Sequence, residues 1–208
     1  MKQIARGAEA VIYFKSSKST IVKRRIKRSY RTTKLDEFLR KTRTKREAKL
    51  ISLARRAGVP TPLIKDVDID RASIELEYIE GKKIRDVLEE ADGEKMEELC
   101  EEIGRLVGKM HAHHIIHGDL TTSNMILSNN GGIYFIDFGL GEVNKSIEAK
   151  GVDLLVFKKT LHSTHYKNED RCWSAFIRGY SAEVENWREI IRRSECIERR
   201  GRYFKVRG

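Results

Sequence analysis

Two acidic motifs in this sequence supply the groups that phosphoryl transfer from ATP requires. The first is the stretch His117-Gly118-Asp119-Leu120-Thr121-Thr122-Ser123-Asn124, and the second, Asp137-Phe138-Gly139, begins thirteen residues after Asn124. The H-x-D-x-x-x-x-N spacing puts Asp119 and Asn124 at the two ends of one tight turn. Each motif follows an apolar run, as expected for loops that leave short strands. The pattern predicts kinase-like chemistry, and the alternative is that two acidic turns happen to follow two strands.

The residue types indicate how such chemistry would be divided. Asp119 is the candidate catalytic base, because its carboxylate can orient an acceptor hydroxyl or a water and take its proton. Asn124 and Asp137 carry hard oxygen ligands of the kind that magnesium prefers, so they are the candidate metal ligands. The predicted cofactors are therefore ATP and Mg²⁺.

A lysine and a glutamate from the first half of the chain complete the predicted phosphate site. Lys23 follows the strand-like residues Ile21-Val22 and is the best candidate to neutralise phosphate charge. Glu47, on the long helix that follows, is the acid expected to hold Lys23 in place, because the other two acids of that helix, Asp36 and Glu37, lie near its start.

A turn and a hinge are expected to complete the nucleotide site. The turn Arg6-Gly7-Ala8-Glu9-Ala10 contains only one glycine, but it lies about sixteen residues before Lys23, where a phosphate-covering turn belongs. The hinge is predicted at Glu80-Gly81. The candidate cofactor-binding residues are Gly7, Ala8, Glu9, Lys23, Glu47, Glu77 and Ile79.

Apolar periodicity predicts the elements that position these residues. Alternating apolar and polar residues over 1–30 indicate antiparallel hairpins, and apolar residues at helical spacing from Leu35 to Ala57 indicate one long helix. Residues 63–79 read as two further strands. After the hinge we expect helices over 84–88 and 96–110, then two short strands that carry the acidic motifs, then helices to about Arg193.

The predicted fold class is α+β, a minimal bilobal protein-kinase-like fold with a small antiparallel-sheet N-lobe and a reduced helical C-lobe. The expected division is 1–79 for the sheet lobe with its long helix, 80–198 for the helical lobe with the catalytic loop, and 199–208 for a basic tail. We expect this tail to be mobile in the isolated chain and to contact tRNA or a partner protein.

Composition describes a chain of 208 residues that can bury a core, with 39% hydrophobic and 35% charged residues. The apolar runs are too short for a signal peptide or a membrane span, so a cytoplasmic protein without membrane contact is expected. Three widely spaced cysteines do not form a disulfide framework or a zinc motif, and the histidines between His111 and His117 are better explained by packing around the catalytic loop than by metal binding.

Positive charge is concentrated in two places. The formal net charge is +11, residues 15–49 hold 15 Lys+Arg against 3 Asp+Glu, and residues 188–208 hold 8 against 3. Two separated basic surfaces fit a long polyanion such as RNA, because release of counterions favours many phosphate contacts. A charged, solvated surface of a thermophilic protein explains the same counts equally well.

The combined motifs resemble the small atypical kinase subunit of the KEOPS (EKC) tRNA-modifying complex, a family also described as piD-type or RIO-like kinases. The likeness covers about residues 1–208. It implies an archaeal or eukaryotic source, use of ATP and magnesium mainly as an ATPase, and a role in making threonylcarbamoyladenosine beside the tRNA anticodon. The implied partners are the threonylcarbamoyl transferase subunit, the other KEOPS subunits and tRNA. The segments that carry it are 6–10, 27–31, 35–36, 43–48, 117–124 and 137–140.

Departures from ordinary protein kinases support this resemblance. Gly118 stands where they commonly carry arginine, no Ala-Pro-Glu follows Asp137-Phe138-Gly139, and only 69 residues remain after Gly139. Such a short lobe leaves no room for a full peptide-docking platform. Asp153 is expected at a helix start, where it either accepts hydrogen bonds from catalytic-loop amides or simply caps the helix.

Two other functions remain open. A small-molecule kinase of the aminoglycoside or sugar type has a similar His-Gly-Asp loop, but it usually needs an inserted acceptor-binding subdomain that is not visible here. A non-catalytic scaffold that binds tRNA and partner subunits would not need Lys23, Asp119, Asn124 and Asp137 together, because charged groups in a cleft cost stability.

Overall fold

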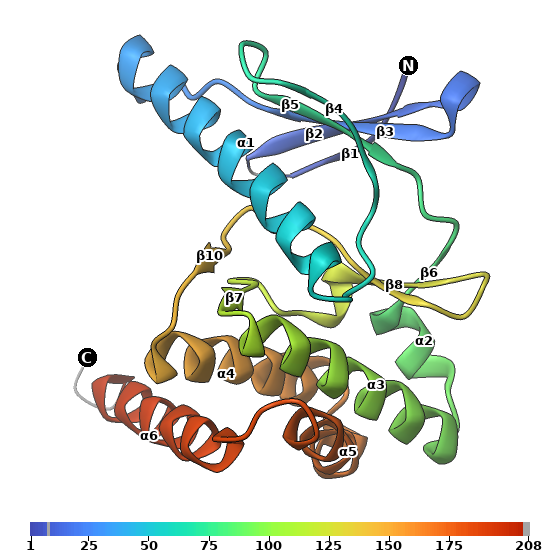
Figure 1. Cartoon of the computed structure of the whole chain (residues 1–208), viewed down its shortest axis with the longest axis vertical. Coiled ribbons are helices and arrows are strands. Elements are labelled where there is room, and N and C mark those ends of the chain that lie inside the picture. Colours follow the sequence, from blue (N-terminus) through green and yellow to red (C-terminus); the bar gives the residue numbers. More distant parts are fainter. Residues whose placement is uncertain (8, 206–208) are drawn as a thin grey trace.

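The computed structural model describes residues 1–7 and 9–205, and side chains up to residue 200. It has two lobes (Figure 1), a twisted sheet with one long helix and a helical lobe below it. The sheet contains β1 (Lys2–Arg6), β2 (Ala10–Lys15), β3 (Thr20–Arg25), β4 (Ile64–Asp68) and β5 (Ser73–Glu77). Its strands are antiparallel in the order β1-β2-β3-β5-β4.

The central strand β3 carries Lys23, and its register is fixed on both sides. Lys23 lies opposite Ile12 of β2 and opposite Ile74 of β5. The short 3₁₀ turn Ser16–Lys18 joins β2 to β3 and ends at Ser19, whose φ of 46° lies in the left-handed region. Because side chains alternate along a strand, Lys23 and Arg25 leave β3 on the same side.

The long helix α1 (Thr33–Arg56) places Glu47 on its buried face. Thr44, Glu47, Leu50, Ile51 and Ala54 recur at steps of three or four residues and form one buried stripe. A carboxylate in that stripe must be compensated by cations, because burial of an unpaired charge is costly.

The helical lobe begins with β6 (Gly81–Lys83), α2 (Ile84–Glu90) and α3 (Gly93–Ala112). Short strands follow: β7 (Ile115–Ile116), β8 (Met125–Ser128), β9 (Ile133–Phe135) and β10 (Glu142–Val143), with the 3₁₀ turn η2 (Thr122–Asn124) before β8. They pair as β6-β8-β9 and β10-β7. The helices α4 (Ile147–Thr164), α5 (Glu169–Ser181) and α6 (Trp187–Lys205) form the base, with a 3₁₀ turn (Tyr166–Asn168) before α5.

One hydrophobic core supports the loops that carry the acidic motifs. Phe135 and Phe138, on either side of Asp137, are fully buried, as is Leu120 of the first motif. They belong to the same cluster as Leu50 of α1 and Phe157 of α4. The core therefore joins the long helix of the upper lobe to the helices of the lower one.

The predicted α+β bilobal architecture is confirmed, and so are the strands around 10–25 and 63–79 and the helices over 35–57, 84–88 and 96–110. The last helix was predicted to end near Arg193, which is wrong, because α6 continues to Lys205 and takes in most of the expected basic tail. Residues 206–208 lie outside the described residues. Within the described chain, no helix combines the length and apolar character needed to cross a membrane.

Candidate active site

The turn that carries Asp119 and Asn124 is closed by the asparagine side chain. Asn124 Nδ2 donates to the Asp119 carboxylate Oδ2 at 2.8 Å and to the Asp119 backbone carbonyl at 3.0 Å. Asn124 N–H also donates to the carbonyl oxygen of Thr121 at 3.0 Å. The two ends of the motif are thus in contact, as the spacing predicted, and the amide oxygen of Asn124 is the atom left to bind a cation.

Asp153 holds the backbone that precedes Asp119. The residue is 1% exposed, and its two carboxylate oxygens accept the N–H groups of His117 at 2.8 Å and Gly118 at 2.9 Å. Asp153 lies inside α4, not at its start; Ser146 caps that helix by accepting from Ala149 N–H. The capping alternative for Asp153 is therefore wrong, and the contact with catalytic-loop amides is confirmed.

A third partner of Asp153 completes its environment. His111 lies with Nε2 3.2 Å from Asp153 Oδ2 and with Nδ1 2.9 Å from the hydroxyl of Tyr180. Burial alone would raise the pKa of the Asp153 carboxyl, but hydrogen bonds and nearby histidines outweigh it and lower the pKa below its ordinary value. The carboxylate form, which can accept from both amides, is the form that this environment favours.

Gly118 is required by the fold of the loop. Its φ is +79°, and a Cβ on it would lie 2.4 Å from the carbonyl oxygen of Leu140. A side chain would force apart the two segments that carry Asp119 and Asp137. The absence of an arginine at this position is therefore a steric requirement of this chain.

The His117 ring contacts the backbone next to both Asp119 and Asp137. Its ring is buried against Phe138, with the ring centroids 4.7 Å apart, and burial lowers its pKa, which favours the neutral ring. Nε2 lies 3.1 Å from the carbonyl oxygen of Ile136, and Nδ1 lies 3.3 Å from Asp119 N. A neutral ring that donates from Nε2 and accepts at Nδ1 satisfies both contacts. No cluster of three potential metal ligands occurs among the described residues.

Asp137 faces Lys23 across the two lobes. Its φ of 61° lies in the left-handed region, which aspartate tolerates better than most residues. Asp137 Oδ1 accepts from Lys23 Nζ at 2.6 Å and from Gly139 N–H at 3.2 Å, while the side chain remains 47% exposed. Burial disfavours the carboxylate, but Lys23 outweighs burial and lowers the pKa of Asp137.

Lys23 is held by two carboxylates. Its Nζ lies 2.6 Å from Glu47 Oε1 as well as 2.6 Å from Asp137 Oδ1, and Glu47 is only 2% exposed. Burial would lower the pKa of Lys23, yet the charges of Glu47 and Asp137 raise it, so the ammonium form is favoured. The contact expected between Lys23 and Glu47 is present.

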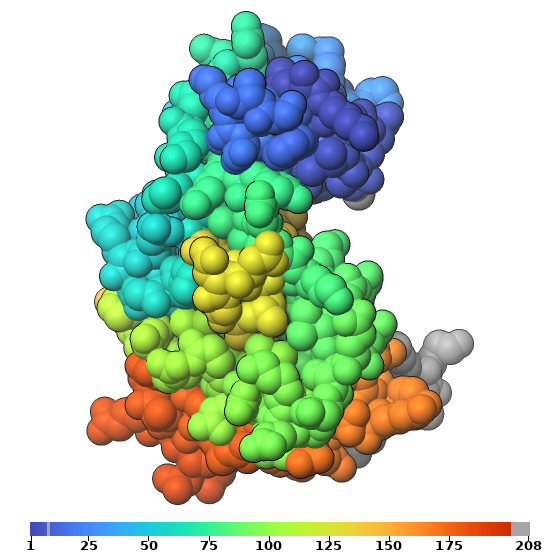
Figure 2. Space-filling view, turned by 90° about the vertical axis from the view of Figure 1, so that its right-hand side faces the viewer, coloured from blue at the N-terminus to red at the C-terminus, as the bar shows by residue number. Residues whose placement is uncertain are grey.

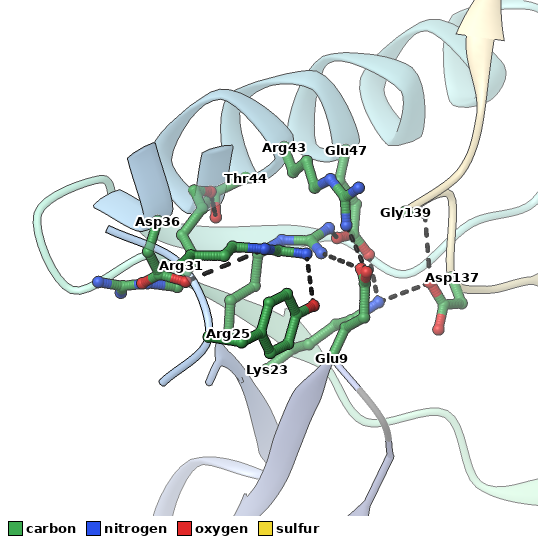
Figure 3. A network of polar contacts seen from close by, with 12 residues as sticks. Glu9, Lys23, Arg25, Arg31, Asp36, Arg43, Thr44, Glu47, Asp137 and Gly139 are labelled. Carbon is green, nitrogen blue, oxygen red and sulfur yellow. Dashed lines mark hydrogen bonds and ion pairs between the residues drawn. The ribbon is translucent and has the colours of Figure 1, made fainter. Parts of the chain in front are cut away.

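A second cation on Glu47 was not predicted. Arg25 Nη2 lies 2.6 Å from Glu47 Oε2, and Arg25 Nη1 lies 3.3 Å from Glu9 Oε2 (Figure 3). Glu9 also pairs with Arg43 of α1, whose hydrogen bond lowers the pKa of Glu9. The spacing of Lys23 and Arg25 along a strand was a signal for this pair, since residues two apart face the same side.

A hollow of about 300 Å³ lies between the lobes, where Figure 2 shows a notch below the blue sheet strands. Neither Glu77 nor Ile79 lines it among the described residues, and a Glu77 oxygen accepts from Leu63 N–H instead. Ala8 lies outside the described residues. The lining residues are Gly7, Glu9, Ala10, Ile12, Lys23, Arg25, Asp119, Asp137, Gly139 and Leu140.

Asp137 lines the hollow, and Asn124 is bound to Asp119 but is not among the lining residues; their side chains carry oxygens that fit a magnesium ion shared with phosphates. One carboxylate, Asp137, and one amide oxygen, that of Asn124, are hard ligands but too few for a cage made by protein alone. Mg²⁺ is commonly bound by one or two carboxylates together with substrate phosphates and water. A hollow with Lys23 and Arg25 beside Asp137 suits that mode.

Fold and site together define a small bilobal protein of the protein-kinase-like class. A family model described as RIO domain matches residues 7–146. The KEOPS complex subunit Bud32 of Pyrococcus abyssi is 45% identical over 98% of this chain and 96% of that protein. The probable serine/threonine-protein kinase BUD32 homolog of Archaeoglobus fulgidus is 44% identical over 96% of this chain and 95% of that protein.

A longer relative contains the same unit. The probable bifunctional tRNA threonylcarbamoyladenosine biosynthesis protein of Methanocaldococcus jannaschii is 43% identical over 97% of this chain, which spans only 37% of that protein. The chain belongs to the RIO-domain family and, within it, to the group that includes the Bud32 proteins. The resemblance inferred from the motifs is confirmed.

Proposed function

We propose that this protein is a magnesium- and ATP-dependent atypical serine/threonine kinase or ATPase of the KEOPS complex, which supports threonylcarbamoyladenosine formation on tRNA. The observation that carries the proposal is the meeting of Lys23, Asp119 and Asp137 in one hollow, with Lys23 tied to Asp137 at 2.6 Å. The names of the relatives given above support a role in threonylcarbamoyladenosine formation.

The residues divide the work as follows. Bound ATP supplies the phosphoryl group, and magnesium neutralises phosphate charge. Lys23 places a positive charge at the phosphates, and Asp137 and Asn124 offer oxygens to the cation. Asp119 orients the acceptor hydroxyl or water and takes its proton, while Asp153 and His117 fix the loop on which Asp119 stands.

A longer relative supports the partners that we propose. In the Methanocaldococcus relative, a unit like this chain is part of a protein more than twice as long that is named for threonylcarbamoyladenosine biosynthesis. We therefore infer that the chain works in the cytoplasm beside the threonylcarbamoyl transferase subunit, other KEOPS subunits and tRNA.

The basic segments favour contact with RNA. Helix α1 and strand β3 before it contain ten of the 15 Lys+Arg of residues 15–49, and several of these side chains are exposed. Helix α6 carries the second basic group at the opposite end of the molecule in Figure 1. Contacts at both places would let one polyanion span the two lobes.

The deciding experiment compares phosphate acceptors. The purified protein is incubated with labelled ATP and magnesium alone, with aminoglycosides or sugars, and with tRNA plus the transferase subunit. Hydrolysis or phosphorylation that increases with tRNA and the transferase supports the proposal. Transfer of label to a small molecule would favour the sugar-kinase alternative, and no turnover under any condition would favour a scaffold.

A further inference from the structure

Arg25 occupies an unusual position beside the lysine of the nucleotide site. Its side chain is 5% exposed, and its guanidinium contacts Glu47 of α1 on one side and Glu9, in the turn between β1 and β2, on the other. A buried guanidinium is retained only where its charge and its several donors are used. Both of its acidic partners lie where the nucleotide site is built.

Glu47 is shared by two cations through separate oxygens. Lys23 Nζ contacts Oε1 and Arg25 Nη2 contacts Oε2, each at 2.6 Å. Because both oxygens are engaged, the carboxylate has little freedom to rotate, and the point at which it meets Lys23 is set by Arg25 as much as by α1. The geometry of the Lys23–Glu47 pair thus depends on a third residue.

Glu9 brings the turn between β1 and β2 into the same network. Its Oε2 lies 3.3 Å from Arg25 Nη1, and its Oε1 is bound by Arg43, one helical turn before Glu47 (Figure 3). The turn itself is closed by Gly7 N–H donating to the Ala10 carbonyl at 2.9 Å. The turn is therefore anchored to α1 through two arginines.

The Asp-Phe-Gly segment also lies against Arg25. A Cβ on Gly139 would be 3.3 Å from Arg25 Nη2, and both residues line the hollow with Asp137. The Arg25 guanidinium thus lies against three segments: the turn between β1 and β2, helix α1, and the loop that carries Asp137. No other described residue of β3 reaches both Glu9 and Glu47.

We propose that Arg25 is a positioning residue of the nucleotide site, which acts by holding Glu47 for Lys23 and Glu9 for the phosphate-covering turn. The inference rests on the proposed function, since it assigns Arg25 a part in the same ATP site. If Arg25 had only a structural role, it would compensate the buried charge of Glu47. Its loss would then not change nucleotide affinity through the turn between β1 and β2.

The test compares Arg25→Gln with Arg24→Gln, a control on the adjacent, exposed residue of the same strand, whose guanidinium lies over the Tyr13 ring. One measurement is the affinity for a non-hydrolysable ATP analogue with magnesium. The other is hydrogen–deuterium exchange, without nucleotide, in the segment that joins β1 to β2. Arg25→Gln should weaken binding about tenfold and accelerate exchange there. Arg24→Gln should do neither.

Further variants separate positioning from charge compensation. Glu9→Gln should weaken binding by a smaller factor. The loss in Arg25→Gln/Glu9→Gln should be smaller than the product of the two single losses, because both changes break the Arg25–Glu9 contact, although Glu9→Gln also affects the contact with Arg43. Arg25→Lys should fall between wild type and Arg25→Gln, since an ammonium keeps the charge but cannot present the same fork of donors. If Arg25→Gln does not fold, Arg25→Lys and Glu9→Gln decide the matter by the same measurements.

The outcomes are distinguishable from those of the proposed function. Wild-type protein that does not bind the ATP analogue would overturn the proposed function, and the exchange comparison would still decide the role of Arg25. Arg25 variants that match Arg24→Gln in affinity and in exchange would overturn the inference while the proposed function stands. Losses in the Arg25 and Glu9 variants that simply multiply in the double variant would also overturn it.

Discussion

Lys23 Nζ and Asp137 Oδ1 lie 2.6 Å apart although 114 residues separate them in the chain. One comes from the central strand of the upper sheet and the other from the loop after β9, so this ion pair joins the two lobes at the hollow. Asp137 remains half exposed and Lys23 is mostly buried. A cation that binds Asp137 would therefore compete directly with Lys23 for the carboxylate.

Lys23 and Glu47 should act as one unit. We expect Lys23→Ala and Glu47→Ala each to reduce ATP turnover, because both changes break the Lys23–Glu47 contact. The double variant should lose little more than the worse single variant. Steady-state turnover of the three proteins measures this, and a loss in log rate equal to the sum of the single losses would show that the residues act separately.

Asp153 should make the fold sensitive to acid. Its folded-state pKa is lowered below the ordinary value of 3.8, so its stabilising contribution is present above about pH 4 and is lost as pH falls through the lower folded-state pKa. Asp153→Asn should lower the free energy of unfolding by about 3 kcal/mol or more at pH 7. An amide has only one oxygen and no negative charge, so it cannot replace the carboxylate as acceptor for both loop N–H groups.

Denaturant unfolding between pH 7 and pH 3 checks the Asp153 prediction. Wild type should lose stability towards pH 3, and Asp153→Asn should show a flatter dependence over the same interval. Asp170, an exposed acid on α5, supplies the control Asp170→Asn. Equal pH dependence in wild type and Asp153→Asn would show that this carboxylate is not responsible.

Gly118 and Gly131 form a matched pair for testing the steric requirement of the loop. Both have positive φ, +79° and +87°, but only a Cβ on Gly118 would meet another segment, 2.4 Å from Leu140 O. Both alanine variants should lose about 1–3 kcal/mol of unfolding free energy, because alanine is strained at positive φ. Only Gly118→Ala should also reduce ATP turnover strongly, and similar turnover in the two variants would contradict the steric argument.

The basic C-terminal segment should contribute phosphate contacts. A chain that ends at Glu198 lacks the Lys and Arg residues of 199–208. We expect weaker tRNA binding and a salt dependence that flattens by about one unit of log-log slope for each lost contact. If the segment serves only the transferase partner, complex-dependent ATP hydrolysis falls instead. If the truncated protein keeps its tRNA affinity, its salt dependence and its complex-dependent ATP hydrolysis, the basic segment has no binding role and is only a charged, solvated surface.

The parts of the site that depend on local sequence could be predicted, and the parts that depend on packing could not. Asp119 and Asn124 share one turn, so their spacing alone indicates their contact. Lys23 and Glu47 could be paired because Glu47 is the only acid in the central part of a helix that is otherwise basic there. Their catalytic and binding roles stay predictions until they are measured.

Arg25 and Asp153 show where sequence reasoning failed. Arg25 is one of many cations before α1, and only the approach of β3 to α1 distinguishes it from exposed Arg24. Asp153 was expected at a helix start, but Ser146 caps α4 and places Asp153 two turns inside it. The end of α6 was missed because Gly201 suggested a break, while the helix continues past it.

The most direct test of the central claim is ATP turnover, with magnesium, tRNA and the transferase subunit, in Asp119→Asn and Asp137→Ala. Both variants should keep the wild-type far-ultraviolet circular dichroism and melting behaviour within a few degrees. We predict that each variant loses ATP turnover almost completely and that Asp119→Asn still binds ATP, because this change removes only the catalytic base. Turnover within severalfold of wild type in either folded variant would contradict the account.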